Sequence, residues 1–545
     1  MVRHFHCMKY WLSCALIFSL SFCSLSYELL LAKVLSDLSQ NEILSQSLGI
    51  GLFLLGLGAG TGVCSLFPEK RPLLKLFKVE TFLSALAFVV GSAAYGVGFL
   101  NLIPAEGAAG SATVYLAVGA MIFLIGFLSG YEFPMLLQSQ AAGASYSIAL
   151  GVSYFGGLFA GIAVPFFLNP GWGPLLSLIY LGLLNFTLAV FLLGMSEERA
   201  IFKPASLAYL LVPTAFLCAG VFTFHRMEQA YLKTTYFAMR IPEVTFESVK
   251  SLLVTLDQIP EVERHHSPYQ KIDLVRSSSK SAWAMDPNDG VTLYLDRRLQ
   301  FTEATIHLYH ESMIHGAFNL SRRIPRRVLI LGGGDGLLAD ELLHFPEVER
   351  IDLVELDPLM IQLAKNHPDF LRLNGGSLFQ EKVRVHINDA FRYLKTIPAG
   401  SVDAVFVDFP YPHSPDLLRL YSIEFYEILN RAMSESAFAV MDGPIYTEKE
   451  MAERGIVVPP QWVIARTLKA AGFPHVFTFG PYEGFYYFTK TESSPRFDYR
   501  TVSPKVSNAA LVNMKETNYL LKGAETLDGA VNSLFRPYPV MPPSP

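Results

Sequence analysis

Acidic residues follow several predicted strands in the second half of this 545-residue chain, at the points where those strands end. Asp335 lies in the glycine run 332–336, Glu355 closes a second strand, and Asp389 and Asp408 follow two more. The carboxyl ends of parallel strands meet at one edge of a sheet, where ligands bind. Carboxylates there can accept hydrogen bonds from ribose hydroxyls. We therefore predict one binding site that these acids share.

The segments around these acids predict a doubly wound α/β fold. A buried strand at 327–331, the glycine turn and a helix from Leu337 form its first unit, and further strands are expected at 350–355, 383–387 and 404–407. Each acid also has a structural explanation when taken alone. The glycines could form a tight turn, Glu355 could be a solvated strand end, and Asp389 could cap the helix that begins near Ala390. Together, the acids favour a functional site.

The region before this fold predicts a small β domain with a helix. Short strand-like segments occur at 271–275 and 291–295, and a helical pattern covers 304–319. The soluble half contains no cysteine, which excludes thiol catalysis and a cysteine-ligated metal there.

A series of short motifs gives the chain a family resemblance. In order, they are Tyr269-Gln270, Leu295-Asp296 with Gln300, Tyr309-His310-Glu311, Gly332 to Gly336, Glu355-Leu356-Asp357, Asp389-Ala390 and Asp408. In this order and spacing the chain resembles the spermidine synthases (polyamine aminopropyltransferases) over roughly residues 265–490. The whole chain resembles the membrane-fused bacterial branch of that family. A generic methyltransferase would share the glycines and the ribose acid, but not the Tyr-His-Glu helix.

The resemblance implies a site for decarboxylated S-adenosylmethionine. Asp335 would hold the aminopropyl ammonium and repel the carboxylate of ordinary S-adenosylmethionine. Glu355 would bind the ribose, and Asp389 with Ala390 would bind the adenine. Gln270 and His310 would line the donor site, although His310 could instead be a packed core histidine.

The resemblance also implies the acceptor side of the site. Asp408 would be the base that takes a proton from the attacking amine, while Gln300, Tyr309 and Tyr411 would line the acceptor pocket. Family members usually carry a second Asp where this chain has Tyr411. We therefore expect weaker diamine binding unless another acid, such as Asp442, replaces it. No metal or redox cofactor is implied, and the donor is a co-substrate.

The first 225 residues predict a membrane domain. The chain has 43 Lys and Arg residues and 48 Asp and Glu residues, and only 18 of these charged residues fall in this region. Apolar stretches of about 20 residues, enough to span a bilayer, predict seven helices. They lie at about 10–31, 45–67, 79–102, 112–138, 144–168, 174–195 and 205–224.

Two halves of this region resemble each other, which favours a 3+3 inverted repeat. Tyr27-Glu28 in the first span recurs as Tyr131-Glu132 in the fourth. A carboxylate within the membrane is costly, so we expect Glu28 and Glu132 to face the bundle interior. Either they serve a function such as transport, or they hydrogen-bond a neighbouring helix. The small residues indicate close helix packing.

The distribution of basic residues and the expected side of the soluble half give opposite orientations in the membrane. Most basic residues of the apolar half fall on the side of the N-terminus, which the positive-inside rule assigns to the cytoplasm. Seven crossings would then place the soluble half outside. We nevertheless expect a multi-pass inner-membrane protein with a cytoplasmic catalytic domain, because its donor resembles a nucleotide. The net charge of -5 does not favour nucleic-acid binding.

The expected organisation is a multi-pass α-helical membrane domain at 1–225, a linker at 226–260, a small β domain with helix at 261–320, a Rossmann-like catalytic domain at 321–490 and a Pro-rich tail at 491–545. We expect the tail to be disordered or loosely docked. The expected function is transfer of an aminopropyl group to a diamine, with putrescine giving spermidine and methylthioadenosine. The alternatives are a membrane-anchored S-adenosylmethionine methyltransferase and a polyamine transporter or sensor with a non-catalytic domain. Expected partners are small polyamines and the lipid bilayer, with a homo-oligomer left open.

Overall fold

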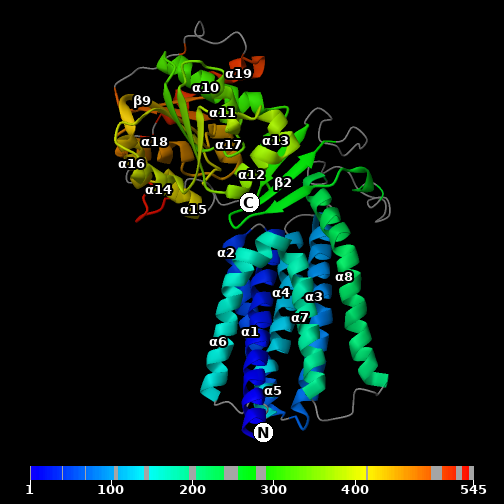
Figure 1. Ribbon diagram of the computed structural model, residues 1–545. Helices are drawn as coiled ribbons and strands as arrows, with labels where there is room; N and C mark the ends of the chain where they lie inside the picture. Colours follow the sequence, from blue (N-terminus) through cyan, green and yellow to red (C-terminus); the bar gives the residue numbers. More distant parts are fainter. Residues whose placement is uncertain are drawn as a thin grey trace. The chain divides into compact units, whose positions relative to one another are not determined.

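The chain forms two compact units, Met1–Asn288 and Asp289–Pro545, each of which is considered separately (Figure 1). The computed structural model describes residues 2–39, 41–67, 69–102, 109–139, 146–195, 204–237, 254, 256–277, 290–412, 415–491, 497, 506–522, 524 and 531–538.

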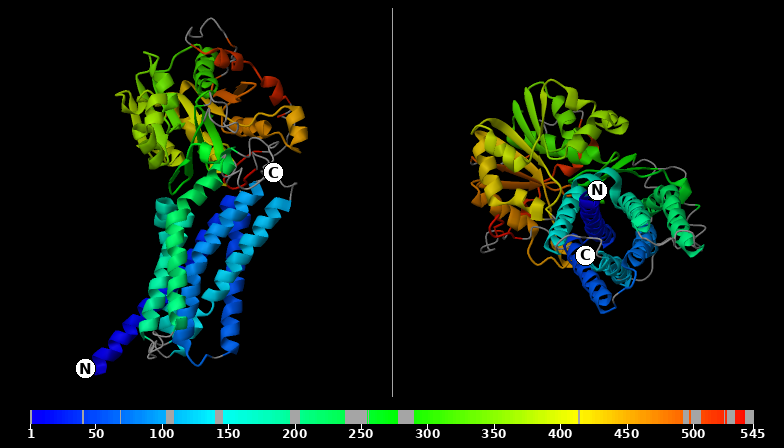
Figure 2. Two further views of the ribbon diagram at one scale, coloured as in Figure 1. Left: turned by 90° about the vertical axis from the view of Figure 1, so that its right-hand side faces the viewer. Right: turned by 60° about the horizontal axis from the view of Figure 1, so that its bottom comes forward.

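Long helices build most of the first unit (Figures 1 and 2). They are α1 Val2–Ser39, α2 Glu42–Leu66, α3 Pro72–Leu102, α4 Ala109–Ser129, α5 Glu132–Gln138, α6 Tyr146–Ala163, the π-helical turn η1 Val164–Leu168, α7 Asn169–Met195 and α8 Pro204–Phe237. Within the described residues, each of the seven apolar stretches is mostly helical. The linker expected from residue 226 begins inside α8 instead, because the helix continues for another three turns.

Five segments of the described chain are long and apolar enough to cross a membrane. They are Trp11–Ser39, Ile43–Leu66, Ala112–Gln138, Tyr146–Met195 and Tyr209–Tyr236. The fourth contains two helices, which meet at Gly173, whose φ of 73° is not helical. The helix α3 is not among these segments.

The helices of this unit pack closely in pairs, while the 3+3 inverted repeat stays a prediction. Helix α1 packs on α6, α2 packs on α4, and α3 packs on α7. In the expected repeat, α1 corresponds to α4, α2 to α6 and α3 to α7. The α1–α6 pair would then correspond to the α2–α4 pair, and the α3–α7 pair would correspond to itself. Glycines allow the α2–α4 contact, because a Cβ on Gly60 would lie 1.9 Å from the carbonyl oxygen of Phe127. Close packing through small residues is therefore confirmed.

A β-hairpin sits at one end of these helices. Strands β1 Glu263–His266 and β2 Lys271–Arg276 pair antiparallel. Lys271 forms an ion pair with Asp37 near the end of α1, and Gln229 of α8 donates a hydrogen bond of 2.8 Å to the carbonyl of Val262. The C-terminal ends of α1 and α8 therefore lie at the same end of the bundle. The chain leaves the bundle at the end opposite to the start of α1.

The second unit is built on a seven-stranded sheet with the order β10-β11-β9-β8-β5-β6-β7. Its strands are β5 Arg327–Gly332, β6 Arg350–Glu355, β7 Val383–Ile387, β8 Val402–Asp408, β9 Met433–Asp442, β10 His475–Phe479 and β11 Phe485–Thr489. The five strands from β5 to β9 are parallel, and β11 and β10 continue the sheet antiparallel. Chain order reverses between β5 and β8, which makes this the switch point where ligands bind in such folds.

Helices cover both faces of the sheet. One core contains buried side chains of α10 Ile306–Ser321, α11 Leu337–Leu343 and α12 Pro358–Asn366. The other contains side chains of α14 Ala390–Thr396, α16 Ile423–Ala432 and α18 Pro460–Ala470. The other helical segments in the described part of the unit are α13 Pro368–Leu373, η4 Ser377–Phe379, α15 Pro415–Leu418, η5 Arg419–Tyr421, α17 Glu448–Glu453, α19 Asn508–Asn513 and η7 Asn518–Leu521. The Rossmann-like architecture is confirmed.

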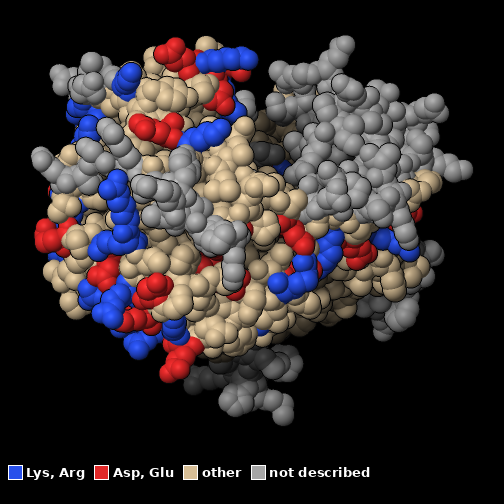
Figure 3. All heavy atoms as spheres, turned by 90° about the horizontal axis from the view of Figure 1, so that it is seen from above, with Lys and Arg blue, Asp and Glu red and all other residues tan. Residues whose placement is uncertain are grey.

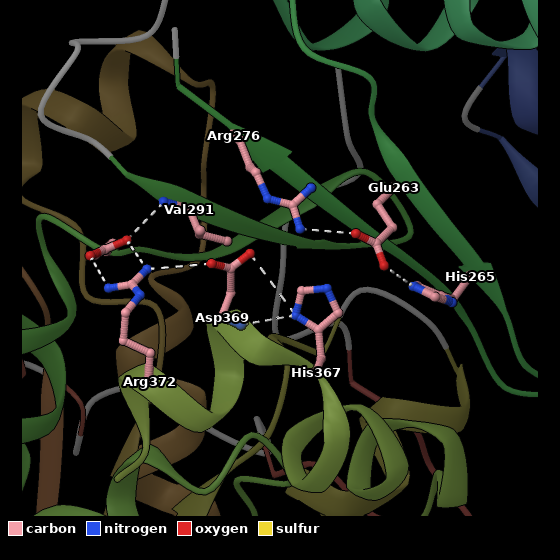
Figure 4. A network of polar contacts seen from close by, with 8 residues as sticks. Glu263, His265, Arg276, Val291, His367, Asp369 and Arg372 are labelled. Carbon is pink, nitrogen blue, oxygen red and sulfur yellow. Dashed lines mark hydrogen bonds and ion pairs between the residues drawn. The ribbon is translucent and has the colours of Figure 1, made fainter.

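A second hairpin belongs to this unit, with strands β3 Val291–Leu295 and β4 Arg298–Thr302. Arg372 of α13, which Figure 4 shows beside Asp369 of the same helix, pairs with the carboxylate of Glu303, the residue that follows β4. The guanidinium donates two hydrogen bonds, of 2.5 and 2.8 Å, and the Val291 amide donates a third to Glu303. This bidentate pair fixes the hairpin to the helical layer.

The expectation of a disordered or loosely docked tail is wrong for its described parts. Val506, Ala510 and Met514 are buried in a small apolar cluster, and α19 packs on α10. Asn532 is 1% exposed, and its amide donates hydrogen bonds to the carbonyls of Leu418 and Tyr421. Apolar burial and satisfied polar groups thus hold a segment whose composition is polar. Its last residues, 539–545, lie outside the described chain.

Candidate active site

The glycine run lets three strand ends approach one another. Gly332 has a φ of 88°, and a Cβ there would lie 2.0 Å from the carbonyl oxygen of Asp408. A Cβ on Gly334 would lie 2.6 Å from a carboxylate oxygen of Glu355. Only glycine fits both positions. The turn therefore brings the carboxyl ends of β5, β6 and β8 together, as the sequence predicts.

Asp408 ends β8 and accepts a hydrogen bond of 2.7 Å from the hydroxyl of Tyr309 on α10. Burial and the nearby charge of Asp335 raise the pKa of Asp408 to about 6. His310 and the Tyr309 hydrogen bond oppose this increase. A carboxylate with such a pKa is ionised at neutral pH and can still accept a proton from an amine, which suits a general base.

Burial also raises the pKa of two neighbouring acids. The carboxylate of Asp335 accepts a hydrogen bond of 3.0 Å from the Leu337 amide, and burial raises its pKa although His310 opposes this. Burial raises the pKa of Glu355 to about 7, while the amide of Asp357 donates a hydrogen bond of 2.8 Å to it. These acids crowd one region and would gain from a cationic ligand.

Asp389 has structural partners for both of its oxygens. One oxygen accepts a hydrogen bond of 2.9 Å from the Arg392 amide at the start of α14, and the other pairs with Arg419. Burial would raise its pKa, but the bond from Arg419 and the Arg392 amide lower it. The cap interpretation is therefore confirmed. The proposed contact of Asp389 and the buried Ala390 with adenine stays a prediction.

Two further residues expected at the donor site, His310 and Gln270, and one expected at the acceptor pocket, Gln300, have different positions. His310 is 7% exposed, and its Nδ1 donates a hydrogen bond of 3.0 Å to the Ile306 carbonyl. It is thus a satisfied histidine that also interacts electrostatically with Asp335 and Asp408. Gln300 directs its amide to the carbonyls of Arg298 and Leu299 on its own strand. Gln270 lies in the β1–β2 turn of the first unit, so its role stays a prediction.

An acid that sequence reasoning missed interacts with Tyr411, one of the residues expected at the acceptor pocket. Tyr411 interacts electrostatically with Asp442 and with Glu483, which lies in the turn between β10 and β11. Asp442 is buried, and burial together with Asp408 and Glu483 raises its pKa well above the usual range. Burial raises the pKa of Glu483 as well. The only sequence signal for Glu483 is an acid enclosed by Gly480 and Gly484.

The C-terminal segment positions this missed acid. Asn513 of α19 is fully buried, and its side-chain oxygen accepts hydrogen bonds from the amides of Tyr482 and Glu483. Its amide donates a hydrogen bond of 3.0 Å to the carbonyl of Glu483. Three bonds from one side chain thus fix the turn that carries Glu483.

Within the described residues, no group of three or more His, Cys, Asp and Glu side chains is arranged to hold a metal ion. The carboxyl groups of the site offer oxygen atoms that can accept hydrogen bonds from ammonium and hydroxyl groups.

Comparison with known proteins agrees with this chemistry. Residues 306–454 match the Spermine/spermidine synthase domain family. The chain is 30% identical over 466 residues to polyamine aminopropyltransferase 1 of Streptomyces coelicolor, covering 84% of this chain and 78% of that protein. It is 31% identical over 502 residues to the polyamine aminopropyltransferase of Mycobacterium tuberculosis, covering 87% and 84%. These similarities extend beyond the second unit into the helical one.

Solved structures with some similarity include spermidine synthase in complex with the transition-state analogue AdoDATO, at 21% identity and a TM-score of 0.40, covering 49% of this chain and 89% of that one. The match to the M. tuberculosis protein spans most of both chains at an identity that shows common family membership. The methyltransferase alternative is thereby replaced, and this chain belongs to the polyamine aminopropyltransferases.

Proposed function

We propose that this aminopropyltransferase uses putrescine as its acceptor and releases spermidine and methylthioadenosine. The observation that carries the proposal is the pair formed by Asp408 and Tyr309, surrounded by further acids at the switch point of the sheet. The family donor, decarboxylated S-adenosylmethionine, and the acceptor both carry ammonium groups. A cluster of carboxylates is complementary to both substrates.

In the proposed donor site, Asp335 holds the aminopropyl ammonium and Glu355 binds the ribose hydroxyls. Each charge-assisted hydrogen bond of this kind is worth about 1.5–3 kcal/mol. Binding also relieves the repulsion among acids that burial has crowded together. Asp335 would disfavour ordinary S-adenosylmethionine, which carries a carboxylate near the same position.

The transfer itself is a direct displacement. The neutral amine nitrogen of the acceptor attacks the methylene carbon next to the sulfonium, a carbon–nitrogen bond forms, and the carbon–sulfur bond breaks. The electron pair of the broken bond stays on sulfur, which leaves as the neutral thioether of methylthioadenosine. Asp408 takes the proton that the amine loses, and Tyr309 orients the carboxylate. Positioning can supply much of the acceleration because the sulfonium is already a good leaving group.

The second ammonium of a diamine needs an acceptor of hydrogen bonds at the far end of the pocket. Tyr411 provides a hydroxyl without charge, whereas Asp442 and Glu483 are the nearby acids. We assign recognition of this distal ammonium to Glu483 with Asp442. With this assignment, an acid binds the distal ammonium even though Tyr411 stands where family members usually carry an Asp.

The helical unit anchors the enzyme in the inner membrane as a multi-pass protein, and the catalytic unit faces the cytoplasm. The support is the set of five apolar segments and the need for a nucleotide-like donor made inside the cell. This orientation places Lys70 and Arg71, at the end of the bundle where α1 begins, on the outer side. It therefore opposes the usual distribution of positive charge.

A single assay tests the proposed reaction. The purified full-length protein is incubated with decarboxylated S-adenosylmethionine and a panel of diamines and triamines, and methylthioadenosine release is measured. We expect turnover with putrescine to exceed that with the other amines, and Asp408→Asn to abolish most of it. Release that prefers a different amine would replace putrescine as the acceptor, and release without any amine would contradict a transfer reaction.

A further inference from the structure

The interior of the helical unit contains an acid that no described side chain neutralises. Glu80 of α3 is fully buried, and neither of its carboxylate oxygens has a hydrogen-bond partner among the described residues. The acid Asp37 of α1, by contrast, is paired with Lys271. A buried carboxylate without a partner is costly and requires either a proton or a cation.

The packing of α3 on α7 places a buried amide opposite Glu80. A Cβ on Gly91 would contact Leu175 and Leu178, and one on Gly182 would contact Ser84 and Ala87. The two helices are therefore antiparallel, with positions 84, 87 and 91 of α3 facing positions 175, 178 and 182 of α7. One turn further along each helix, the same faces carry Glu80 and Asn185. Asn185 is fully buried, and both polar atoms of its side chain lack a partner within the described chain.

Two other helices contribute to this cluster. Helix α5 packs on α3, and Glu132 at its first position is 6% exposed. Glu132 interacts electrostatically with Glu80, and both interact with Tyr27 of α1. The Tyr27 hydroxyl is also buried and without a partner in the described residues. Glu28 is equally buried, as the sequence predicts, but it is not part of these interactions.

We propose that Glu80, Glu132, Asn185 and Tyr27 form a binding site for an alkylammonium cation within the helical unit. A protonated primary amine carries three N–H donors, and two carboxyl groups, an amide oxygen and a phenol oxygen supply acceptors for all three. Two carboxylates are too few ligands for a protein-bound divalent metal. The choice of an amine over an inorganic cation rests on the proposed function, in which the enzyme handles polyamines. The site is separate from the catalytic acids, because it consists of different residues in the other compact unit.

Equilibrium binding to the full-length protein in lipid nanodiscs tests this site. Radiolabelled spermidine is titrated onto the wild type and onto Glu80→Gln, Glu132→Gln and Glu28→Gln. We expect two sites per chain in the wild type and in Glu28→Gln, and one site in the other two variants. Glu28→Gln is the matched control, since it removes a buried carboxylate of the same unit outside the cluster. Melting temperatures identify any variant that fails to fold. If either Glu80→Gln or Glu132→Gln fails to fold, the stoichiometry of the other variant tests the site.

Three outcomes would overturn the proposal. These are a single spermidine site in the wild type, an equal loss in Glu28→Gln, and displacement of spermidine from the second site by an equal concentration of sodium chloride. Methylthioadenosine release is measured in parallel and should stay unchanged in all three variants. Failure of putrescine as the acceptor would appear in that assay alone, whereas failure of the helical site would appear in the binding stoichiometry alone.

Discussion

Asp408 shares the carboxyl edge of the sheet with acids that oppose its ionisation. Burial and Asp335 raise its pKa to about 6, whereas Tyr309 and His310 favour the carboxylate. The local balance sets the pH at which this group can accept a proton. Small changes around the carboxylate should therefore appear in the pH dependence of the reaction.

The first prediction concerns this base. Asp408→Asn should lower kcat by about 10²–10⁴-fold, the usual value of a general base. In the wild type, kcat/KM should fall as the pH decreases through about 6, because protonated Asp408 cannot accept the amine proton. Tyr309→Phe removes a bond that stabilises the carboxylate, so the acidic limb should move to higher pH. Tyr426→Phe, whose hydroxyl contacts the Met441 sulfur in the core, is the control. An unmoved limb in Tyr309→Phe would contradict the pairing.

The second prediction concerns the distal ammonium of the acceptor. Glu483→Gln removes a charge-assisted hydrogen bond worth about 1.5–3 kcal/mol, so KM for putrescine should increase about tenfold or more with little change in kcat. The exposed Glu347→Gln on the same unit is the matched control and should leave KM unchanged. Steady-state kinetics with varied putrescine provide the measurement. A loss confined to kcat would remove Glu483 from substrate recognition.

At the scale of elements, short polar side chains and glycines determine which segments can approach. Asn513 fixes the β10–β11 turn from a helix that follows it in the chain, and the glycines of α2 and α4 allow two helices to touch. Neither the Asn513 hydrogen bonds nor the interhelical glycines bury large apolar side chains of their own. Both decide where larger elements are placed.

The third prediction concerns Asn513, whose hydrogen bonds hold the β10–β11 turn that carries Glu483. Asn513→Ala removes three hydrogen bonds and leaves backbone groups unpaired, so the turn should loosen and KM for putrescine should rise. Hydrogen exchange of peptides covering residues 480–484 should accelerate together with the KM change. Asn366→Ala at the exposed end of α12 should change neither quantity. A higher KM without faster exchange would assign the effect to something other than the turn.

The α2–α4 contact predicts opposite results for two nearby glycines of α2. Gly60→Ala should destabilise the bundle by about 1–3 kcal/mol, because its Cβ would overlap the backbone of Phe127. Gly58→Ala meets no atom within 4 Å and should be neutral or stabilising by up to about 1 kcal/mol, since alanine favours helix. Thermal unfolding in detergent compares the two. Equal melting temperatures would mean that α2 and α4 are not in contact.

At the scale of the whole molecule, one chain joins a unit of long apolar helices to a unit built on a mixed sheet. The helical unit buries Glu28, Glu80 and Glu132 among apolar helices. On the face that Figure 3 shows, Lys and Arg side chains are interspersed with Asp and Glu side chains. Each unit has its own core and can be perturbed separately.

Topology follows from the way the chain passes through the bundle. Because the ends of α1 and α8 lie together, the N-terminus and the catalytic unit should face opposite sides of the membrane. With a cytoplasmic catalytic unit, a C-terminal green fluorescent protein should fluoresce and a C-terminal alkaline phosphatase should be inactive. A fusion at residue 69, at the end where α1 begins, should give the reverse pattern. Active phosphatase at the C-terminus would place catalysis outside the cytoplasm.

The sequence by itself determined the main features of both units. Apolar stretches of spanning length predicted the helices, because that signal is local and continuous. The glycine run and the acids at strand ends predicted the active-site edge, since strand ends of a parallel sheet necessarily meet. The placement of Asp335, Glu355 and Asp408 at one edge therefore follows from the sequence pattern alone.

Only the tertiary structure decided which distant residues meet. Glu483 lies in a turn, and its position beside Tyr411 depends on Asn513, which follows it by 30 residues. The placement of Glu80 opposite Asn185 likewise depends on how two helices rotate against each other. The sequence of one helix does not show how that helix is rotated against its neighbour. The polar composition of the tail likewise does not show that a few of its residues are buried. These contacts come from packing, which only the folded chain specifies.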